Sequence, residues 1–416
     1  MKMRCWLMGV LLMAGLAEAS RPAVSRQEAE VLERAMRVAE TNVAAAAGLL
    51  DEARAGGRGS AALDYSAGNL RAGEEAYEEA VAAYRVALGK VPEFVEARVG
   101  LARALALMEA WGEAETELRG VALREDAKEE VLLLYGYVLL ELGRWVSAET
   151  IYRRAALAGG DSVEAYLGLA RCFMAMERYA EAAGLAEELA GRAPENGVAW
   201  ALLGDARLGL DQPEEARVAL ESARRLGVAT PGMLLTLGEA YVAGGLAEAG
   251  AEGGRGLDGT DAGPEGWLRM AGILLAAERG DEAAAWLDRY GNEVKEPGAT
   301  YFRLRAEWGD LTGQEAEARA AREAWARLEP TNERVLLALG DAALREGKAA
   351  AAELWFDRAR LANPGRVEPL LRLARLALDK EEYDTAIRHL EQALVLRGDP
   401  AIERTLQQVR RLVELR

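Results

Sequence analysis

The sequence has very little of the residues that build metal centres and nucleophilic active sites. Among its 416 residues there are one histidine, His389, and two cysteines, Cys5 and Cys172. A His/Cys metal cluster needs three or four such ligands, and a Ser-His-Asp triad would have to use His389, which has no nucleophile motif near it. Cys172 stands in an apolar stretch that is typical of a buried, inert thiol. We therefore expect no enzyme activity, no metal and no other cofactor.

Positive charge is also scarce. Aspartate and glutamate together number 68 against 51 lysines and arginines, and the formal net charge is −17. A nucleic-acid binder needs a basic face for the phosphates, so this composition argues against nucleic acid as a partner. Proline and phenylalanine are rare, while alanine, leucine, glutamate and arginine dominate, which favours helix.

Only one long apolar run is present, at residues 6–16. It follows a positively charged start and precedes the small-residue sequence Ala-Glu-Ala at 17–19, which is the pattern of a signal peptide cleaved before Ser20. We expect residues 1–19 to direct export, with retention of the run as an uncleaved anchor as the alternative. The mature chain would be periplasmic, would have no transmembrane segment, and would keep only Cys172, so that no internal disulfide could form.

A 34-residue repeat organises the rest of the chain. Starting from Gly204, successive 34-residue steps in both directions reach small residues only: Gly68, Ala102, Gly136, Ala170, Gly204, Gly238, Gly272, Ala306, Gly340 and Ala374. Twelve positions further on, a second series is equally small: Ala80, Ala114, Ala148, Ala182, Ala216, Gly250, Ala284, Ala318, Ala352 and Ala386. Bulky apolar residues recur at fixed distances beside both series. This pattern predicts two amphipathic helices per unit that cross closely at the small residues.

The unit resembles the tetratricopeptide repeat. The best match has the family's Trp-x-x-Leu-Gly start intact and comprises Trp200, Leu203, Gly204, Ala216, Leu220 and Ala223. The resemblance implies an all-α fold, a right-handed superhelical solenoid of about ten helix-turn-helix repeats, with a concave groove lined by the first helix of each pair. We expect repeats one to six to begin at 61 and run to 246, and repeats seven to ten to occupy 265–398.

Two flanking segments complete the predicted organisation. Ser25 and Glu28 have the spacing of a capping box that opens a helical segment reaching about Ala55, followed by Gly56, Gly57 and Gly59. Residues 20–60 would cap the first repeat, and residues 399–416 read as an amphipathic helix that caps the last one.

The stretch GGRGLDG at 253–259 looks at first like a dinucleotide-binding loop or a calcium-binding repeat. A dinucleotide loop must follow a strand, and a calcium site of this type needs tandem copies, so neither is expected here. The repeat phase places the stretch inside the second helix of repeat six, where each interior glycine costs about 1 kcal/mol relative to alanine. We predict a soft joint at 247–264, by which we mean a weakened helix between the earlier and the later repeats. Asp288 and Gly291 stand at positions that are apolar in other repeats, and they suggest that repeat seven is weakened too.

The resemblance implies that the residue after each first small residue faces the groove. These residues, together with two arginines four positions earlier, are the candidate partner-binding set: Asn69, Arg103, Tyr137, Arg171, Asp205, Glu239, Arg269, Arg303, Glu307, Asp341 and Arg375. Ile273 occupies the same place in repeat seven. An apolar strip of Leu133, Leu167, Leu235, Leu337 and Leu371 is expected beneath the charges. The alternative is that these are solvated positions without a ligand.

The sequence thus predicts a non-catalytic interaction scaffold in the bacterial cell envelope. Its groove would bind a peptide or helix of other envelope proteins, in secretion, pilus or polysaccharide-export assembly. The lysine-asparagine clamp by which some family members hold a terminal carboxylate is absent, since the corresponding pairs are Tyr65 with Asn69 and Val99 with Arg103. Binding of a non-protein ligand, such as a glycan or cell-wall fragment, is the alternative function.

Overall fold

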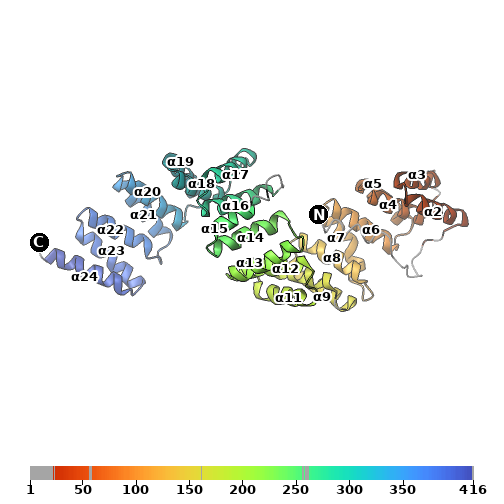
Figure 1. The fold of residues 1–416 in the computed structure, drawn as a ribbon, viewed down its shortest axis with the longest axis horizontal. Helices are drawn as coiled ribbons and strands as arrows, with labels where there is room; N and C mark the ends of the chain where they lie inside the picture. Colours follow the sequence, from red (N-terminus) through yellow and green to blue (C-terminus); the bar gives the residue numbers. More distant parts are fainter. Residues whose placement is uncertain are drawn as a thin grey trace. The chain divides into compact units, whose positions relative to one another are not determined.

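The computed structural model describes residues 22, 24–55, 59–160, 162–254, 257 and 262–414. Within these ranges all regular secondary structure is helical, and the helices follow one another in antiparallel pairs (Figure 1). Residues 1–19, and with them the predicted signal peptide, lie outside the described residues, as do Gly56, Gly57, Gly256 and Gly259. The all-α fold predicted from the repeat is confirmed.

Ten helix pairs occupy the region in which the sequence predicts ten repeats. Their first helices are α4 (Ala61–Gly73), α6 (Val95–Leu107), α8 (Glu129–Glu141), α10 (Val163–Ala175), α12 (Gly197–Gly209), α14 (Pro231–Ala243), α16 (Gly263–Ala276), α18 (Ala299–Thr312), α20 (Glu333–Arg345) and α22 (Glu368–Asp379). Their second helices are α5 (Tyr77–Lys90), α7 (Trp111–Ala122), α9 (Trp145–Gly159), α11 (Tyr179–Arg192), α13 (Pro213–Arg225), α15 (Ala247–Gly254), α17 (Gly280–Glu293), α19 (Glu315–Leu328), α21 (Ala349–Ala362) and α23 (Tyr383–Leu396). The pairs are flanked by α2 (Arg26–Ala39) and α3 (Val43–Arg54) before them and by α24 (Pro400–Glu414) after them.

The chain divides into two compact units, with the boundary inside α13. The first unit contains residues up to Gln212 together with Ser222–Gly227, and the second contains Pro213–Glu221 and the chain from Val228 onward. Each unit is built from consecutive helix pairs that pack against their neighbours in sequence order.

Close crossing of the two helices in a pair explains the small residues. Gly68 of α4 lies against the ring of Tyr84 on α5, and a Cβ atom added to Gly68 would come within 2.6 Å of Tyr84 Cε1. Gly136 has the same relation to Tyr152, with a Cβ placed 2.9 Å from the ring. Tyr84 itself is 1% exposed. The large ring fills the space that the missing side chain leaves, so that the pair packs without a void.

A residue with positive φ closes the turn within every pair. These residues are Glu75, Glu109, Gly143, Glu177, Asp211, Gly245, Glu278, Gly313, Gly347 and Glu381. They follow one another in 34-residue steps as far as Gly245, and again from Gly313 onward. The step from Gly245 to Glu278 is one residue shorter, and the step from Glu278 to Gly313 is one residue longer. The helix pair α16–α17 is therefore displaced by one residue from the phase of the other repeats.

This displacement corrects the sequence-based interpretation of repeat seven. The buried apolar residues of α17 are Ala283, Leu287 and Tyr290, each one position before the place that the repeat phase predicts. Asp288 is solvent-exposed and pairs with Arg305 across 2.7 Å, so it does not occupy a core position. The prediction that Asp288 and Gly291 weaken this repeat is wrong, because Leu287 and Tyr290 fill the corresponding places.

The second helix of repeat six, α15, is described over 8 residues, Ala247–Gly254. Gly250 is required there, because an added Cβ would lie 2.7 Å from the carbonyl oxygen of Gly238. Leu257 beyond the helix is 1% exposed and packs in the core of this region. The soft joint at 247–264 remains a prediction.

The segment before the first repeat folds as a pair of helices, α2 and α3. The predicted capping box is confirmed: Glu28 N donates to Ser25 Oγ at 3.3 Å, and Ser25 N donates to Glu28 Oε2 at 2.8 Å. The second oxygen of the same carboxylate accepts from the backbone of Ser60 at 2.7 Å. Glu28 thus joins the start of α2 to the start of α4.

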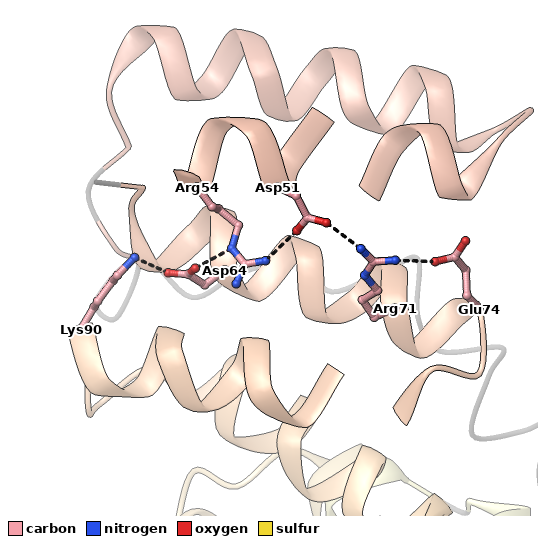
Figure 2. Close-up of polar contacts among 6 residues, drawn as sticks. All are labelled: Asp51, Arg54, Asp64, Arg71, Glu74 and Lys90. Atoms are coloured by element: carbon pink, nitrogen blue, oxygen red, sulfur yellow. Dashed lines mark hydrogen bonds and ion pairs between the residues drawn. The ribbon is translucent and has the colours of Figure 1, made fainter. Parts of the chain in front are cut away.

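A chain of ion pairs attaches the α2–α3 pair to the first repeat (Figure 2). At its centre the buried carboxylate of Asp64 accepts from Arg54 Nε at 2.7 Å and from Lys90 Nζ at 2.5 Å. The Asp64 side chain is 2% exposed, so its charge depends on these two cations. The complete chain runs Lys90, Asp64, Arg54, Asp51, Arg71 and Glu74, from α5 through α4 and α3.

Helix α24 occupies the place of a further first helix after α23. It buries Ile402, Leu406 and Val409 against the last pair. Gln407 and Gln408, which stand one 34-residue step after Leu373 and Ala374, are exposed. The role of α24 as a cap of the last repeat remains a prediction.

Candidate functional site

The predicted partner-binding residues lie on the first helices, one or two to each helix from α4 to α22. We call the solvent-accessible side of these helices the first-helix face. Arg375 is exposed, and the other ten candidates are partly exposed. Ile273 is 3% exposed and belongs to the core, which corrects its place in the predicted groove row. The one-residue displacement of α16 is the reason, since it turns Ile273 inward.

The acidic candidates of the second unit are paired with arginines of their neighbours. Arg269 on α16 donates from Nε and Nη2 to the two carboxylate oxygens of Glu239 on α14, both at 2.7 Å. Its Nη2 also donates to Thr236 Oγ1 at 3.0 Å. The bidentate geometry is the strongest form of such a contact, and each side chain keeps about a third of its surface exposed.

Two further pairs follow along the same face. Arg372 on α22 holds Asp341 on α20 by two hydrogen bonds of 3.0 and 3.1 Å. Glu307 on α18 accepts from Arg303 at 3.0 Å and from Arg334 of α20 at 2.8 Å. Arg334 and Arg372 were not among the predicted residues. The signal that could have found Arg372 is its separation of 31 residues from Asp341, which is close to the separation of 30 between Glu239 and Arg269.

The candidate partner-binding residues of the first unit lie in different surroundings from those of the second unit. Asn69 Oδ1 accepts the hydroxyl of Tyr84 at 2.7 Å, so its side chain is engaged in the helix crossing. Burial raises the pKa of Tyr137 to about 12, with Glu141 adding to the effect. The ring of Tyr137 meets that of Trp111 edge to face, at 5.6 Å between centroids. Arg103 makes no ion pair with any residue of the described ranges, and its charge acts on Tyr84.

Three of the predicted residues meet in a cleft of the second unit. The cleft has a volume of about 440 Å³ and runs across α14, α16 and α18 on the first-helix face. Charged groups at its edge include Glu239, Arg269 and Arg303. Its apolar lining is formed by Val242, Ala243, Leu268, Gly272, Ile273 and Leu304, and Glu265 and Thr300 complete it. Apolar volume beside a few placed polar groups is the usual composition of a binding cleft.

The predicted apolar strip is only partly available to a ligand. Leu133 and Leu235 are 6% and 2% exposed and belong to the core, which corrects their assignment to the surface. Leu167, Leu337 and Leu371 are partly exposed. The continuous strip is therefore replaced by separate apolar patches.

In the described part of the chain, groups of three or more His, Cys, Asp or Glu side chains arranged to hold a metal are absent. None of the helices within those ranges has the length and apolar character needed to cross a bilayer.

Burial raises the pKa of the Cys172 thiol to about 12, which keeps it protonated and unreactive.

Comparison with known proteins gives consistent matches to one repeat family. Residues 71–136 and 173–229 match one family model described as Tetratricopeptide repeat, and residues 133–197 match another with the same description. Comparison with curated proteins gives no match.

Several solved structures align with this chain. A tetratricopeptide repeat protein from Parabacteroides merdae ATCC 43184 aligns with a TM-score of 0.50 and 17% identity, over 60% of this chain and 97% of that one. A chain of the APC/C hetero-tetramer Cut9-Hcn1 aligns with a TM-score of 0.46 and 12% identity, over 91% and 89% of the two chains. Pseudomonas aeruginosa pilF aligns with a TM-score of 0.42 and 21% identity, over 52% and 99%. At 17% identity, the likeness to the Parabacteroides merdae protein concerns the fold alone.

Tetratricopeptide repeat proteins generally mediate protein–protein interaction. The family models cover residues 71–229. Helix pairs of the same construction, each closed by a turn residue of positive φ, continue to the end of α23. Over residues 71–229 the chain belongs to the tetratricopeptide repeat family.

Proposed function

We propose that this protein is a non-catalytic scaffold of the bacterial cell envelope whose first-helix face binds a segment of another envelope protein. The observation that carries this proposal is the cleft across α14, α16 and α18, where apolar volume lies beside Glu239, Arg269 and Arg303. An extended or helical segment binds such a surface by placing apolar side chains in the cleft and polar groups at its edge.

The basic residues of the first unit supply a second contact region for the same kind of partner. Arg103 has no counterion within the described ranges, and Arg171 lies close enough to Tyr137 to affect its ionisation. A carboxylate of the partner would supply the missing negative charge near Arg103. Charge-assisted hydrogen bonds of this type direct specificity and register more than they add affinity.

The place of action follows from the start of the sequence. The charged start, the apolar run at 6–16 and the Ala-Glu-Ala sequence at 17–19 form an export signal. We propose cleavage before Ser20 and a periplasmic location. Secretion, pilus assembly and polysaccharide export are the settings in which an exported scaffold of this size would serve.

The proposal is tested by capture from native envelope. The mature protein with a C-terminal tag is crosslinked in cells, recovered, and analysed by mass spectrometry beside the double variant Arg103→Glu with Arg171→Glu. We expect a few defined envelope proteins with the wild type and an approximately tenfold lower yield with the double variant. Recovery of the same proteins at the same yield would remove these arginines from the binding surface.

A matched control separates binding from general charge effects. Arg34→Glu with Arg404→Glu makes the same change of net charge at two exposed residues, on α2 and α24, away from the candidate residues. Its partner yield should equal that of the wild type. Recovery of glycan in place of proteins, lost at high salt because it rests on screened charges, would favour the alternative of a non-protein ligand.

A further inference from the structure

Gly272 lines the cleft, and its lack of a side chain is not needed for helix packing. The 34-residue phase assigns it to the crossing point of α16 with α17, but the displacement by one residue puts Ala271 there, at 0% exposure. A Cβ atom added to Gly272 would meet only Leu304 Cδ2, at 3.7 Å, which is an ordinary van der Waals contact.

The crossing glycines of other repeats are different. A Cβ on Gly68 would lie 2.6 Å from Tyr84, and one on Gly238 would lie 2.8 Å from Ile273. An added Cβ at either position would force the neighbouring side chain to shift. Gly272 is under no such constraint, although glycine is less favourable than alanine inside a helix. What its missing side chain provides is open volume between α14 and α18.

Near α18 two guanidinium groups contact one carboxylate, while the acidic Glu265 on α16 also lines the cleft. Arg303 makes both of its hydrogen bonds to Glu307 from Nη1, at 3.0 and 3.1 Å. Arg334 donates to the same carboxylate at 2.8 Å. Two guanidinium groups therefore share one carboxylate, whereas Glu239 and Arg269 on the opposite side neutralise each other. The Nε and Nη2 atoms of Arg303 have no hydrogen bond within the described residues.

We propose that the space above Gly272 is a specificity pocket for a bulky aliphatic or aromatic side chain of the partner segment, with an adjacent aspartate or glutamate of that segment bound to Arg303. The apolar side chain contacts Val242, Leu268 and Leu304, and the carboxylate completes the charge balance beside Glu307. This inference rests on the proposed function, because it specifies which protein segment the first-helix face selects.

The experiment uses random twelve-residue peptides displayed on phage and selected on the full mature chain. The same library is selected on Gly272→Leu, which fills the pocket, and on Gly184→Leu. Gly184 is exposed on the second helix α11 with nothing within 4 Å of an added Cβ, so it is the matched control. Melting temperatures of the variants check that each remains folded.

The wild type should enrich peptides in which a bulky apolar residue stands next to an acidic one. Binding of these peptides should fall about tenfold to a hundredfold on Gly272→Leu, as expected for losing the burial of one large apolar side chain. It should be unchanged on Gly184→Leu. A third variant, Arg303→Gln, should keep the apolar preference and lose the acidic one.

The possible contrary results are distinct. Peptides that bind wild type and Gly272→Leu equally well would overturn the pocket and leave the proposed function standing. Enrichment on wild type of sequences without a bulky apolar residue would overturn it in the same way. Absence of any enriched peptide on the wild type would overturn both the pocket and the binding of a linear segment.

Discussion

Arg269 and Glu239 form a bidentate ion pair between α16 and α14 with a sequence separation of 30, whereas the corresponding pair Arg372 and Asp341 has a separation of 31. The two arginines hold the same place on their helices relative to the acid of the preceding repeat. The difference of one residue is the displacement that the turn residue Glu278 also shows. The same spatial relation is thus kept despite a change of one residue in the chain between the helices.

The Arg269–Glu239 pair should contribute measurably to stability. A double-mutant cycle with Arg269→Ala and Glu239→Ala is expected to give a coupling free energy of about 0.5–1 kcal/mol, since the pair is bidentate but about one-third exposed. The exposed pair Arg85 with Glu113, whose side chains are 56% and 62% exposed, is the matched control and should couple by less. Equal coupling energies from thermal unfolding of both cycles would contradict the argument from burial.

Asp64 should be essential for attaching α2 and α3 to the first repeat. Asp64→Ala leaves Arg54 and Lys90 without their buried counterion, and such a loss typically costs about 3–5 kcal/mol. Amide hydrogen exchange in α2 and α3 should accelerate strongly, while exchange in α20 to α23 stays unchanged. Asp51→Ala is the control, because Asp51 is 43% exposed and its loss should cost under about 1 kcal/mol. Protection of α2 and α3 that is the same in both variants would refute the role of Asp64.

A fall in pH should destabilise helices α2 and α3 through protonation of Glu28. The hydrogen bond from the Ser25 backbone, aided by Ser60, lowers the pKa of Glu28 to about 2. A group whose folded pKa is depressed stabilises the fold above its unfolded pKa, and that contribution is lost as pH falls toward the folded pKa. The protection factors of the α2 amides against hydrogen exchange should therefore fall between about pH 4.5 and pH 2 in the wild type. Glu28→Gln should start less protected and show a weaker dependence on pH in that window, and an unchanged profile would count against this assignment.

The glycine-rich stretch should be the first site of cleavage. Helix α15 has 8 residues, and each interior glycine weakens it by about 1 kcal/mol relative to alanine. Limited proteolysis of the mature chain, analysed by mass spectrometry, should cut first between residues 244 and 266. Replacing Gly253 by alanine should slow that cut, since an added Cβ there meets nothing within 4 Å. A first cut elsewhere, with this stretch resistant, would exclude the soft joint.

The sequence alone determined the repeat architecture. Small residues at one point of each helix and bulky ones beside them follow from local geometry, because two helices approach closely only where side chains are small. The pattern therefore predicted ten helix pairs. The spacing of Ser25 and Glu28 predicted the capping box of α2, and residues 399–416 were predicted to form a helix from their own apolar spacing. These features depend on contacts between residues that are at most about one repeat apart in the chain, so the spacing of residues in the sequence reveals them.

Only the tertiary structure decided the register of repeat seven and the partners of the charged residues. Ala271 and Gly272 are both small, as are Ala283 and Ala284, so either register fits the 34-residue series. The structure selects Ala271 and Ala283 because Leu287 and Tyr290 then reach the core. Likewise, the pairing of Glu239 with Arg269, or of Arg303 with Glu307, depends on which side chains meet across adjacent helices. A shift of one residue changes which side chains are in contact, and it therefore changes the lining of the cleft that contains Gly272.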